Sequence, residues 1–336
     1  MDDRRSVIPV LSDVTALNSR GPDSERLIQR FQALANDFGL AYSANTVRAM
    51  AADWRVWTTY CSANGVTALP ATLDDLRRFL QDSVAAGKKR ATLNRYLSTL
   101  ASMHRMADVP WPVDTQAGRL MWKAIRRQLT ERQEQATGLT SDAIESVVQS
   151  LDPSKLRDAR DAALLSLAYE TMARASELVA LTLNDVDCEP DGSGRVLIRR
   201  SKTDQEGEGA LLYLSPPSWN LVQRWVAEAE ISEGPLFRAV PRAKVPKAGA
   251  ALSERDISRI FKARVGAAGL DTFKISAHST RVGPAQDLLA AGYGLPEIQQ
   301  QGRWKNAQMV VRYGERIESG RGAMARYKGS LRSKPS

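Results

Sequence analysis

Cysteine and histidine are scarce in this chain, which contains only 2 of each among its 336 residues. Cys61 and Cys188 follow no metal-binding spacing, and nothing around them indicates a disulfide framework. His104 and His278 are too few for a metal site built on histidine. We therefore expect neither a metal ion nor a disulfide scaffold.

Long apolar runs and nucleotide-binding motifs are also missing. No stretch of about 18 apolar residues is available to span a membrane, and the N-terminal MDDRRSVIPVLSDV has no hydrophobic core of signal-peptide length. Neither GxxxxGK(S/T) nor GxGxxG occurs. We therefore expect a cytoplasmic protein that uses no cofactor and contacts no membrane.

Positive charge is what the chain has in excess. Its 47 Lys and Arg against 38 Asp and Glu give a formal net charge of +9 and a pI near 9.7. Such an excess favours a polyanionic partner, most often nucleic acid, although a merely basic surface is the alternative. The length of the chain favours two domains.

The first part of the chain predicts a helical domain. Residues 1–22 mix charge with Ser, Pro and Gly, and we expect them to form a flexible tail. Within residues 23–130, apolar side chains recur at helical spacing and no strand pattern appears. One such stripe begins after Ser43 and consists of Val47, Met50, Ala51, Trp54, Trp57 and Cys61. The polar run TERQEQATG then predicts a linker at residues 131–139.

The second part, residues 140–336, predicts helices with a small sheet inserted. In LTLNDVDCEPDGSGRVLIRRSKTD, two β-prone runs flank the turn signal EPDGSG, and GALLYL adds a third strand. Pro216 opens a further helix, and Ser253 with Asp256 has the spacing of a capping box. The expected fold class is therefore mainly α with a small antiparallel β-sheet.

Two pairs of residues attract attention by their surroundings. Arg174 and Glu177 lie in the otherwise apolar YETMARASELVAL, where a charge is unfavourable unless it is paired or meets an anionic ligand. An internal Arg174–Glu177 ion pair is the alternative to a ligand site. In SAHSTRVG, His278 and Arg281 share one face if the segment is helical, although a surface His–Arg pair would have the same spacing.

Three further residues complete a set suited to one chemistry. Lys202 falls in a predicted hairpin turn, and the alternative to a catalytic role is a lysine that is simply solvated. Trp304 lies in GRWKN, and Tyr313 follows nine residues later. A phosphodiester in transfer gains charge on its nonbridging oxygens, which guanidinium, imidazole and indole N–H groups bind. A lysine can protonate the leaving oxygen, and adjacent cations favour the phenolate of a nucleophilic tyrosine.

On these residues the sequence resembles the tyrosine recombinase (phage integrase) family. The segments ATLNRYLSTLASMHR, HSTRVGPAQDLLAAG, GRWKNAQMVVRY and ESGRGAMARY resemble a phage member of the family in the same order. The resemblance implies that Tyr313 attacks the scissile phosphate to give a 3′-phosphotyrosine. It further implies that Arg174, Arg281, His278 and Trp304 bind the phosphate, that Lys202 protonates the leaving 5′-oxygen, and that Glu177 orients its neighbours.

The resemblance also implies an architecture. An N-terminal SAM-like core-binding domain (23–130) and a C-terminal catalytic domain (140–336) would form a C-shaped clamp around double-stranded DNA. Members of the family join two sites with inverted repeats through a Holliday junction, as homotetramers, without metal or ATP. The segment GAMARY resembles a C-terminal helix that docks into an adjacent protomer.

Other basic residues are candidates for DNA contacts. Arg255 takes the place of a base-reading arginine in the family pattern, with a phosphate or solvent contact as the alternative. The remaining candidates are Arg242 and Lys244 in the acid-free loop RAVPRAKVPK, and Lys88, Lys89 and Arg90 at the start of a helix.

Two other functions stay open on the sequence alone. A non-cleaving DNA-binding protein of the same fold would have no need of the catalytic set. A type IB topoisomerase would use similar chemistry to relax DNA. The implied docking helix favours recombination, because a relaxing monomer has no use for it.

Overall fold

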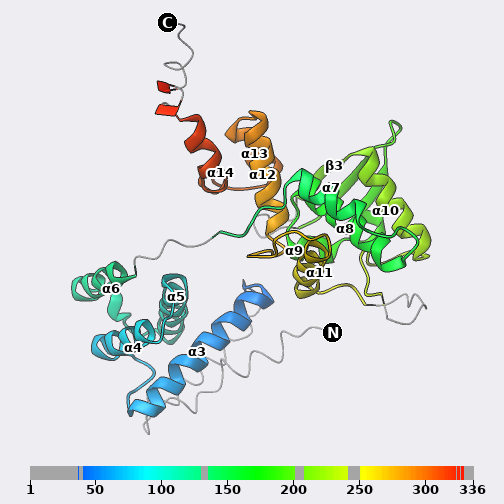
Figure 1. Cartoon of the computed structure of the whole chain (residues 1–336). Helices are drawn as coiled ribbons and strands as arrows, with labels where there is room; N and C mark the ends of the chain where they lie inside the picture. The colour runs from blue at the N-terminus through cyan, green and yellow to red at the C-terminus, as the bar shows by residue number, and fades with distance from the viewer. Residues whose placement is uncertain are drawn as a thin grey trace, which may run out of the picture. The chain divides into compact units, whose positions relative to one another are not determined.

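The structure is a computed structural model that describes residues 37, 41–129, 135–200, 208–240, 250–322, 324, 325, 327 and 328. The chain divides into two compact units, residues 1–133 and 134–336 (Figure 1). This division falls within the segment that the sequence predicts as a linker, whereas the predicted tail lies outside the described residues. None of the described helices has the length and apolarity needed to cross a membrane.

The first unit is a bundle of helices. They are α3 (Ala44–Asn64), α4 (Leu73–Ala85), α5 (Arg90–Ala107) and α6 (Gln116–Gln128), and no strand occurs among residues 41–129. Ser43 caps α3 by accepting a hydrogen bond from the backbone N–H of Thr46 at 3.2 Å. The apolar stripe predicted after Ser43 is buried along its whole length. The prediction of an all-α unit is confirmed.

Two buried polar groups connect the elements of this bundle. The indole N–H of Trp57 donates to the carbonyl of Ala68 at 2.8 Å. The Nε2 atom of His104 accepts from the backbone N–H of Ala71 at 3.0 Å, so its Nδ1–H donates to the carbonyl of Leu100 at 2.7 Å. Burial lowers the pKa of His104, which is therefore a neutral structural group.

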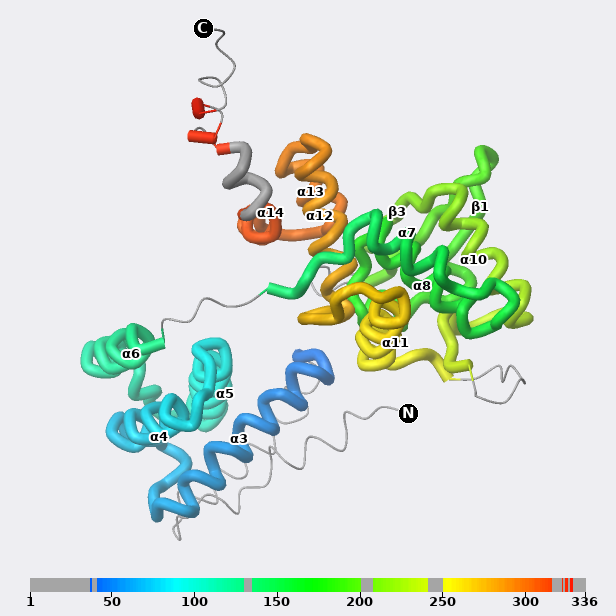
Figure 2. The backbone as a smooth tube through the Cα atoms, viewed as in Figure 1, coloured from blue at the N-terminus to red at the C-terminus, as the bar shows by residue number. Residues whose placement is uncertain are grey.

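The second unit is built around α8 (Leu156–Thr171). Every side chain of α8 from Ala159 to Ala168 is buried, which makes it the interior helix. The other helices are α7 (Ser141–Gln149), α9 (Ala175–Ala180), α10 (Pro216–Glu228), α11 (Glu254–Ala267), α12 (Ser279–Ala291), α13 (Leu295–Gln301) and α14 (Gln308–Arg321) (Figure 2). Met172, just after α8, packs with α12, α13 and α14 in a small apolar cluster that includes Trp304 and Tyr313.

A three-stranded antiparallel sheet lies between α9 and α10 in the sequence, as predicted. β2 (Gly194–Ile198) pairs with β1 (Val186–Cys188) on one side and with β3 (Ala210–Leu214) on the other. The strands present alternate faces to the core, since Leu212 and Leu214 are buried while Leu211 and Tyr213 are exposed. The predicted fold class is confirmed.

Two glycines bring the start of the second unit against α12. The backbone N–H of Leu139 donates to the carbonyl of Ser279 at 3.0 Å. A Cβ atom on Gly283 would lie 1.8 Å from the carbonyl oxygen of Leu139, and one on Gly138 would lie 2.9 Å from the backbone nitrogen of Gly283. Only glycine permits so close an approach of two backbones. The segment is thereby fixed to the helix whose first turn enters the candidate active site.

Candidate active site

Arg174 and Glu177 lie at the start of α9. The Glu177 carboxylate accepts a hydrogen bond from the backbone N–H of Arg174 at 2.9 Å and forms an ion pair with Nη1 of Arg174 at 2.6 Å. The Glu177 side chain is 1% exposed, whereas that of Arg174 is 19% exposed. The internal ion pair considered as the alternative is therefore present, and it leaves part of the Arg174 side chain accessible.

Arg281 lies in the first turn of α12 and is 1% exposed. Its Nη1 donates to the carbonyl of Met172 after α8, and its Nη2 donates to the carbonyl of Gly302 after α13 at 2.7 Å. The guanidinium thus joins the ends of two helices. Burial and the nearby charges of Arg174 and Arg303 lower the pKa of Arg281 to about 9, so it remains a cation at neutral pH.

Tyr313 lies on α14 with its hydroxyl oxygen 2.6 Å from Nε2 of His278. The tyrosine is 3% exposed, and its ring meets that of Trp304 edge-on with 5.6 Å between centroids. The guanidinium carbon of Arg281 lies 4.8 Å from the centroid of the Trp304 ring, a cation–π contact. Residues far apart in the sequence therefore form one cluster.

Burial and the charges of this cluster shift the pKa values of His278 and Tyr313. Loss of hydration and the charges of Arg281 and Arg174 lower the pKa of His278 to about 4, although the residue keeps an exposed edge. Burial raises the pKa of Tyr313, and the charges of Arg281, Arg312 and Arg174 offset only part of that effect. Adjacent cations therefore favour the phenolate, as expected from the sequence, but in the chain by itself burial outweighs them and the pKa of Tyr313 is raised. At neutral pH a phenol therefore faces a neutral imidazole, whose Nε2 can accept a hydrogen bond from the phenol hydroxyl.

Comparison with known proteins assigns this cluster to a family. The model of the phage integrase family matches residues 138–318, and that of the phage integrase N-terminal SAM-like domain matches residues 29–108. The chain belongs to the phage integrase family. It is accordingly a tyrosine recombinase, an enzyme of site-specific DNA recombination, and the family predicted from the sequence is confirmed.

Individual recombinases match over most of their length. Recombinase cre of Escherichia phage P1 is 31% identical over 304 residues, which cover 85% of this chain and 88% of that protein. An integrase/recombinase xerD homolog of Selenomonas ruminantium is 30% identical over 285 residues, covering 82% of each. In a post-cleavage complex of XerH with its palindromic difH substrate, the XerH chain shares the fold with a TM-score of 0.63 and 16% identity. That match covers 96% of this chain and 97% of the XerH chain.

Arg303 is a member of the cluster that sequence reasoning missed. Its Nη2 forms an ion pair with Oε2 of Glu177 at 2.7 Å, and its Nη1 donates to the carbonyl of Thr171 at 3.0 Å. In the motif GRWKN, the sequence marks Trp304 alone as a candidate. Arg303 is a cation beside that tryptophan, but nothing in the sequence shows that its side chain pairs with a glutamate 126 positions away.

The remaining predicted residues are either outside the described residues or exposed elsewhere on the recombinase. Lys202, Arg242 and Lys244 lie outside the described residues. Arg255 is exposed in the first turn of α11, and Lys88, Lys89 and Arg90 are exposed at the start of α5 in the first unit. Within the described parts of the chain, no three His, Cys, Asp or Glu side chains gather as a metal site would require.

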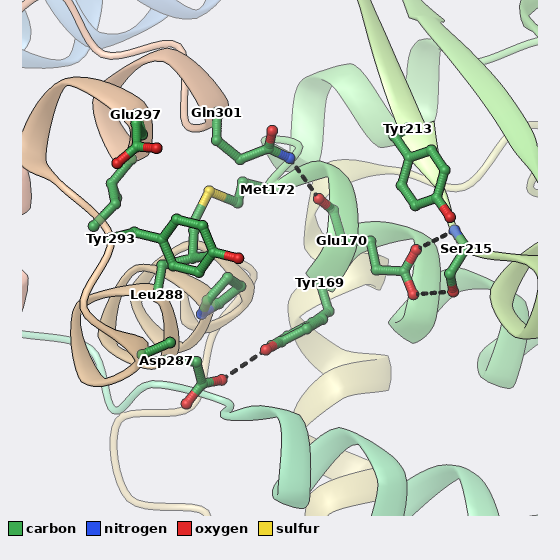
Figure 3. A pocket seen from close by; sticks show the side chains of 13 residues that line it. Tyr169, Glu170, Met172, Tyr213, Ser215, Asp287, Leu288, Tyr293, Glu297 and Gln301 are labelled. Atoms are coloured by element: carbon green, nitrogen blue, oxygen red, sulfur yellow. Dashed lines mark hydrogen bonds between the residues drawn. The ribbon is translucent and has the colours of Figure 1, made fainter.

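A separate cavity of about 520 Å³ lies in the second unit, lined by α8, β3, α12 and α13 residues (Figure 3). Its apolar wall includes Met172 and Leu288, and Tyr213 and Tyr293 are half exposed beside it. Hydrogen bonds fix its polar edge: the Tyr169 hydroxyl donates to Asp287 at 2.7 Å, and the Gln301 side chain donates to the Glu170 carbonyl at 2.9 Å. The cavity combines apolar walls with acidic groups at its edge.

Proposed function

We propose that this recombinase cuts and rejoins DNA with Tyr313 as the nucleophile. The observation that carries the proposal is the hydrogen bond of 2.6 Å between the Tyr313 hydroxyl and the neutral His278 ring, next to arginines held in place by the fold. The phenol oxygen attacks the scissile phosphorus while its proton passes to Nε2 of His278. The bond from phosphorus to the 5′-oxygen breaks, and Lys202 supplies the proton to that oxygen.

Two arginines give this phosphate its site. Arg174 is the accessible guanidinium and binds a nonbridging oxygen directly. Arg281, stacked on Trp304, supplies a second positive charge in an environment of low polarity, where it acts more strongly than in water. Glu177 keeps Arg174 in place. A 5′-hydroxyl from the partner strand then attacks the phosphotyrosine, which reverses the chemistry and completes exchange through a Holliday junction.

Double-stranded DNA is the proposed partner. Among the similar structures, XerH is bound to its difH substrate and a lambda integrase dimer is bound to a core site. These complexes support DNA as the partner here. The exposed Arg255 and the exposed run Lys88, Lys89 and Arg90 suit phosphate or base contacts, and Arg242 and Lys244 are proposed for the same role. The site of action is the nucleoid in the cytoplasm.

We further propose that a homotetramer assembles when the C-terminal segment of one protomer enters the 520 Å³ cavity of the next. Met324 is 69% exposed and Tyr327 is 57% exposed, so this segment presents apolar groups outward. The segment GAMARYK also carries Arg and Lys, which complement Asp287 and Glu297 at the edge of the cavity. Polarity and charge therefore favour a second copy of this chain as the occupant.

Met324→Glu is expected to lower recombination between two sites at least about tenfold, because a carboxylate is unfavourable in an apolar cavity. Binding of one protomer to a half-site should change by less than about threefold. Gel-shift titration and a two-site recombination assay measure the two quantities. Phe273→Glu is the matched control, because Phe273 is also exposed on the second unit, at 62%. Full recombination by Met324→Glu would refute the docking proposal.

The recombinase function is tested on DNA that the purified protein selects from a random library. The selected sequence is expected to be an inverted repeat whose arms span about one helical turn each. A supercoiled plasmid with two copies should yield recombinant circles. Relaxed plasmid without recombinants would instead support the topoisomerase alternative, and bound but uncut plasmid would support a non-cleaving DNA-binding protein.

A further inference from the structure

Three consecutive residues after α13 contact two charged members of the active-site cluster, Arg281 and Glu177. The Gly302 carbonyl accepts from Arg281, the Arg303 guanidinium pairs with Glu177, and Trp304 stacks on Arg281. A Cβ atom on Gly302 would lie 2.0 Å from the Trp304 ring, so the three residues form a closely packed unit. Of the three, only Arg303 adds a charge to the site.

The backbone at Arg303 closes the C-terminus of α13. Its φ of 51° lies in the left-handed region, which residues with a Cβ atom rarely adopt. The N–H of Arg303 donates to the carbonyl of Gln300 at 3.0 Å and that of Trp304 to the carbonyl of Gln299 at 3.1 Å, so the left-handed residue completes a Schellman-type cap. The Nε atom of Arg303 is buried, and no described residue accepts a hydrogen bond from it. The cap explains the backbone conformation but not the buried, unpartnered Nε.

The Arg303 guanidinium bridges three elements of the second unit. Nη1 holds the Thr171 carbonyl at the end of α8, and Nη2 holds Oε2 of Glu177 at the start of α9. Oε1 of the same carboxylate holds Nη1 of Arg174 at 2.6 Å. A chain of contacts therefore runs from Arg303 through the almost fully buried Glu177 to the accessible Arg174.

The charges explain why the carboxylate needs a second cation. Burial alone would raise the pKa of Glu177, yet its pKa is lowered, and the charge of Arg303 is the largest of the effects that lower it. Hydrogen bonds from Arg174 come next. Without Arg303, a buried carboxylate would have only one guanidinium to keep it ionised.

We propose that Arg303 is a positioning residue for DNA cleavage, which acts by holding the Glu177 carboxylate and, through it, the phosphate-binding side chain of Arg174. The inference rests on the proposed function, because it needs a cleavage step to support. Arg303 itself does not touch the reacting atoms. Its role is to fix the angle at which the Arg174 fork meets the phosphate, which a displacement of about 1 Å would spoil.

Arg303→Met tests this inference on a nicked duplex that carries a library-selected site, at saturating protein. The single-turnover rate of covalent adduct formation is expected to fall about 10- to 100-fold, while the dissociation constant for that duplex changes by less than about threefold. The defect should grow as pH falls, because Glu177 without Arg303 takes up a proton at higher pH than in the parent. Arg303→Lys keeps a charge and should recover part of the rate.

Two comparisons separate positioning from a general loss of structure. Arg264→Met removes another guanidinium that is paired with the buried Asp161 and the partly buried Asp158, and it should leave the cleavage rate within about threefold at a temperature where both variants are folded. In a Glu177→Gln background, Arg303→Met should slow cleavage by no more than about a further threefold, because the pathway through Glu177 is already lost.

The parent chain and the variants together separate the proposed function from the role of Arg303. A parent chain that forms no adduct overturns the proposed function, whatever Arg303 does. A parent that cleaves, together with an Arg303→Met variant that cleaves at the same rate, overturns only the role of Arg303. Fully multiplicative effects of Arg303→Met and Glu177→Gln would likewise show that Arg303 does not act through Glu177.

Discussion

Tyr313→Phe is expected to abolish covalent attachment to DNA, with the rate of adduct formation lowered at least about ten-thousandfold. The substitution removes one oxygen and leaves the ring, which packs at 5.7 Å from the His278 ring and 5.6 Å from the Trp304 ring. Phosphate binding by the arginines does not depend on the phenol oxygen. The dissociation constant for DNA should therefore stay within about threefold of the parent value. A nicked suicide duplex and a denaturing gel measure the adduct, and a gel shift measures binding.

The folded structure should tolerate the loss of this hydroxyl. Its hydrogen bond goes to His278, whose exposed edge lets water reach the imidazole when the phenol is gone. We therefore expect the free energy of unfolding to change by no more than about 1 kcal/mol. Tyr96→Phe is the control, because Tyr96 is also buried but lies in the core of the first unit. A Tyr313→Phe protein that still forms the adduct would refute the assignment of the nucleophile.

Helices and the sheet could be predicted because their signals are local. The stripe after Ser43 repeats at the spacing of one helix face, and the turn signal EPDGSG separates β1 from β2. Each pattern fits within about 20 residues. Such patterns determine which side chains are buried, so the bundle and the small sheet follow from the sequence.

The site was predictable only in its residue types. Family motifs identify Arg174, His278, Arg281, Trp304 and Tyr313. The environment of these side chains, however, depends on contacts between distant segments. The almost complete burial of Arg281 depends on two backbone carbonyls from other helices. The raised pKa of Tyr313 depends on how much water the folded chain excludes, which the motif does not encode. The role of Arg303 depends on a left-handed backbone that the sequence does not signal.

Gly283→Ala is expected to lower the free energy of unfolding of the second unit by about 3 kcal/mol. An alanine in a helix is favoured over glycine by about 1 kcal/mol, but here its Cβ would meet backbone atoms of Leu139 at 1.8 Å and 2.2 Å. Backbone cannot give way as a flexible side chain can. The segment would leave α12, which breaks the Leu139–Ser279 hydrogen bond and exposes Leu139, now 2% exposed. Urea denaturation followed by circular dichroism measures the loss.

Gly266→Ala is the matched control, because it places the same methyl group inside another helix of the same unit. Its Cβ would meet only a side-chain methyl group of Thr272 at 3.1 Å, which a small shift relieves. The favourable helix propensity of alanine should then dominate, and the free energy of unfolding should stay constant or rise by up to about 1 kcal/mol. The same substitution is therefore expected to lower the free energy of unfolding at Gly283 and to leave it constant or raise it at Gly266. Equal stability of the two variants would show that the backbone contact between Leu139 and α12 does not fix the segment. Cleavage by Gly283→Ala should also slow, because the first turn of α12 carries Arg281 and begins next to His278.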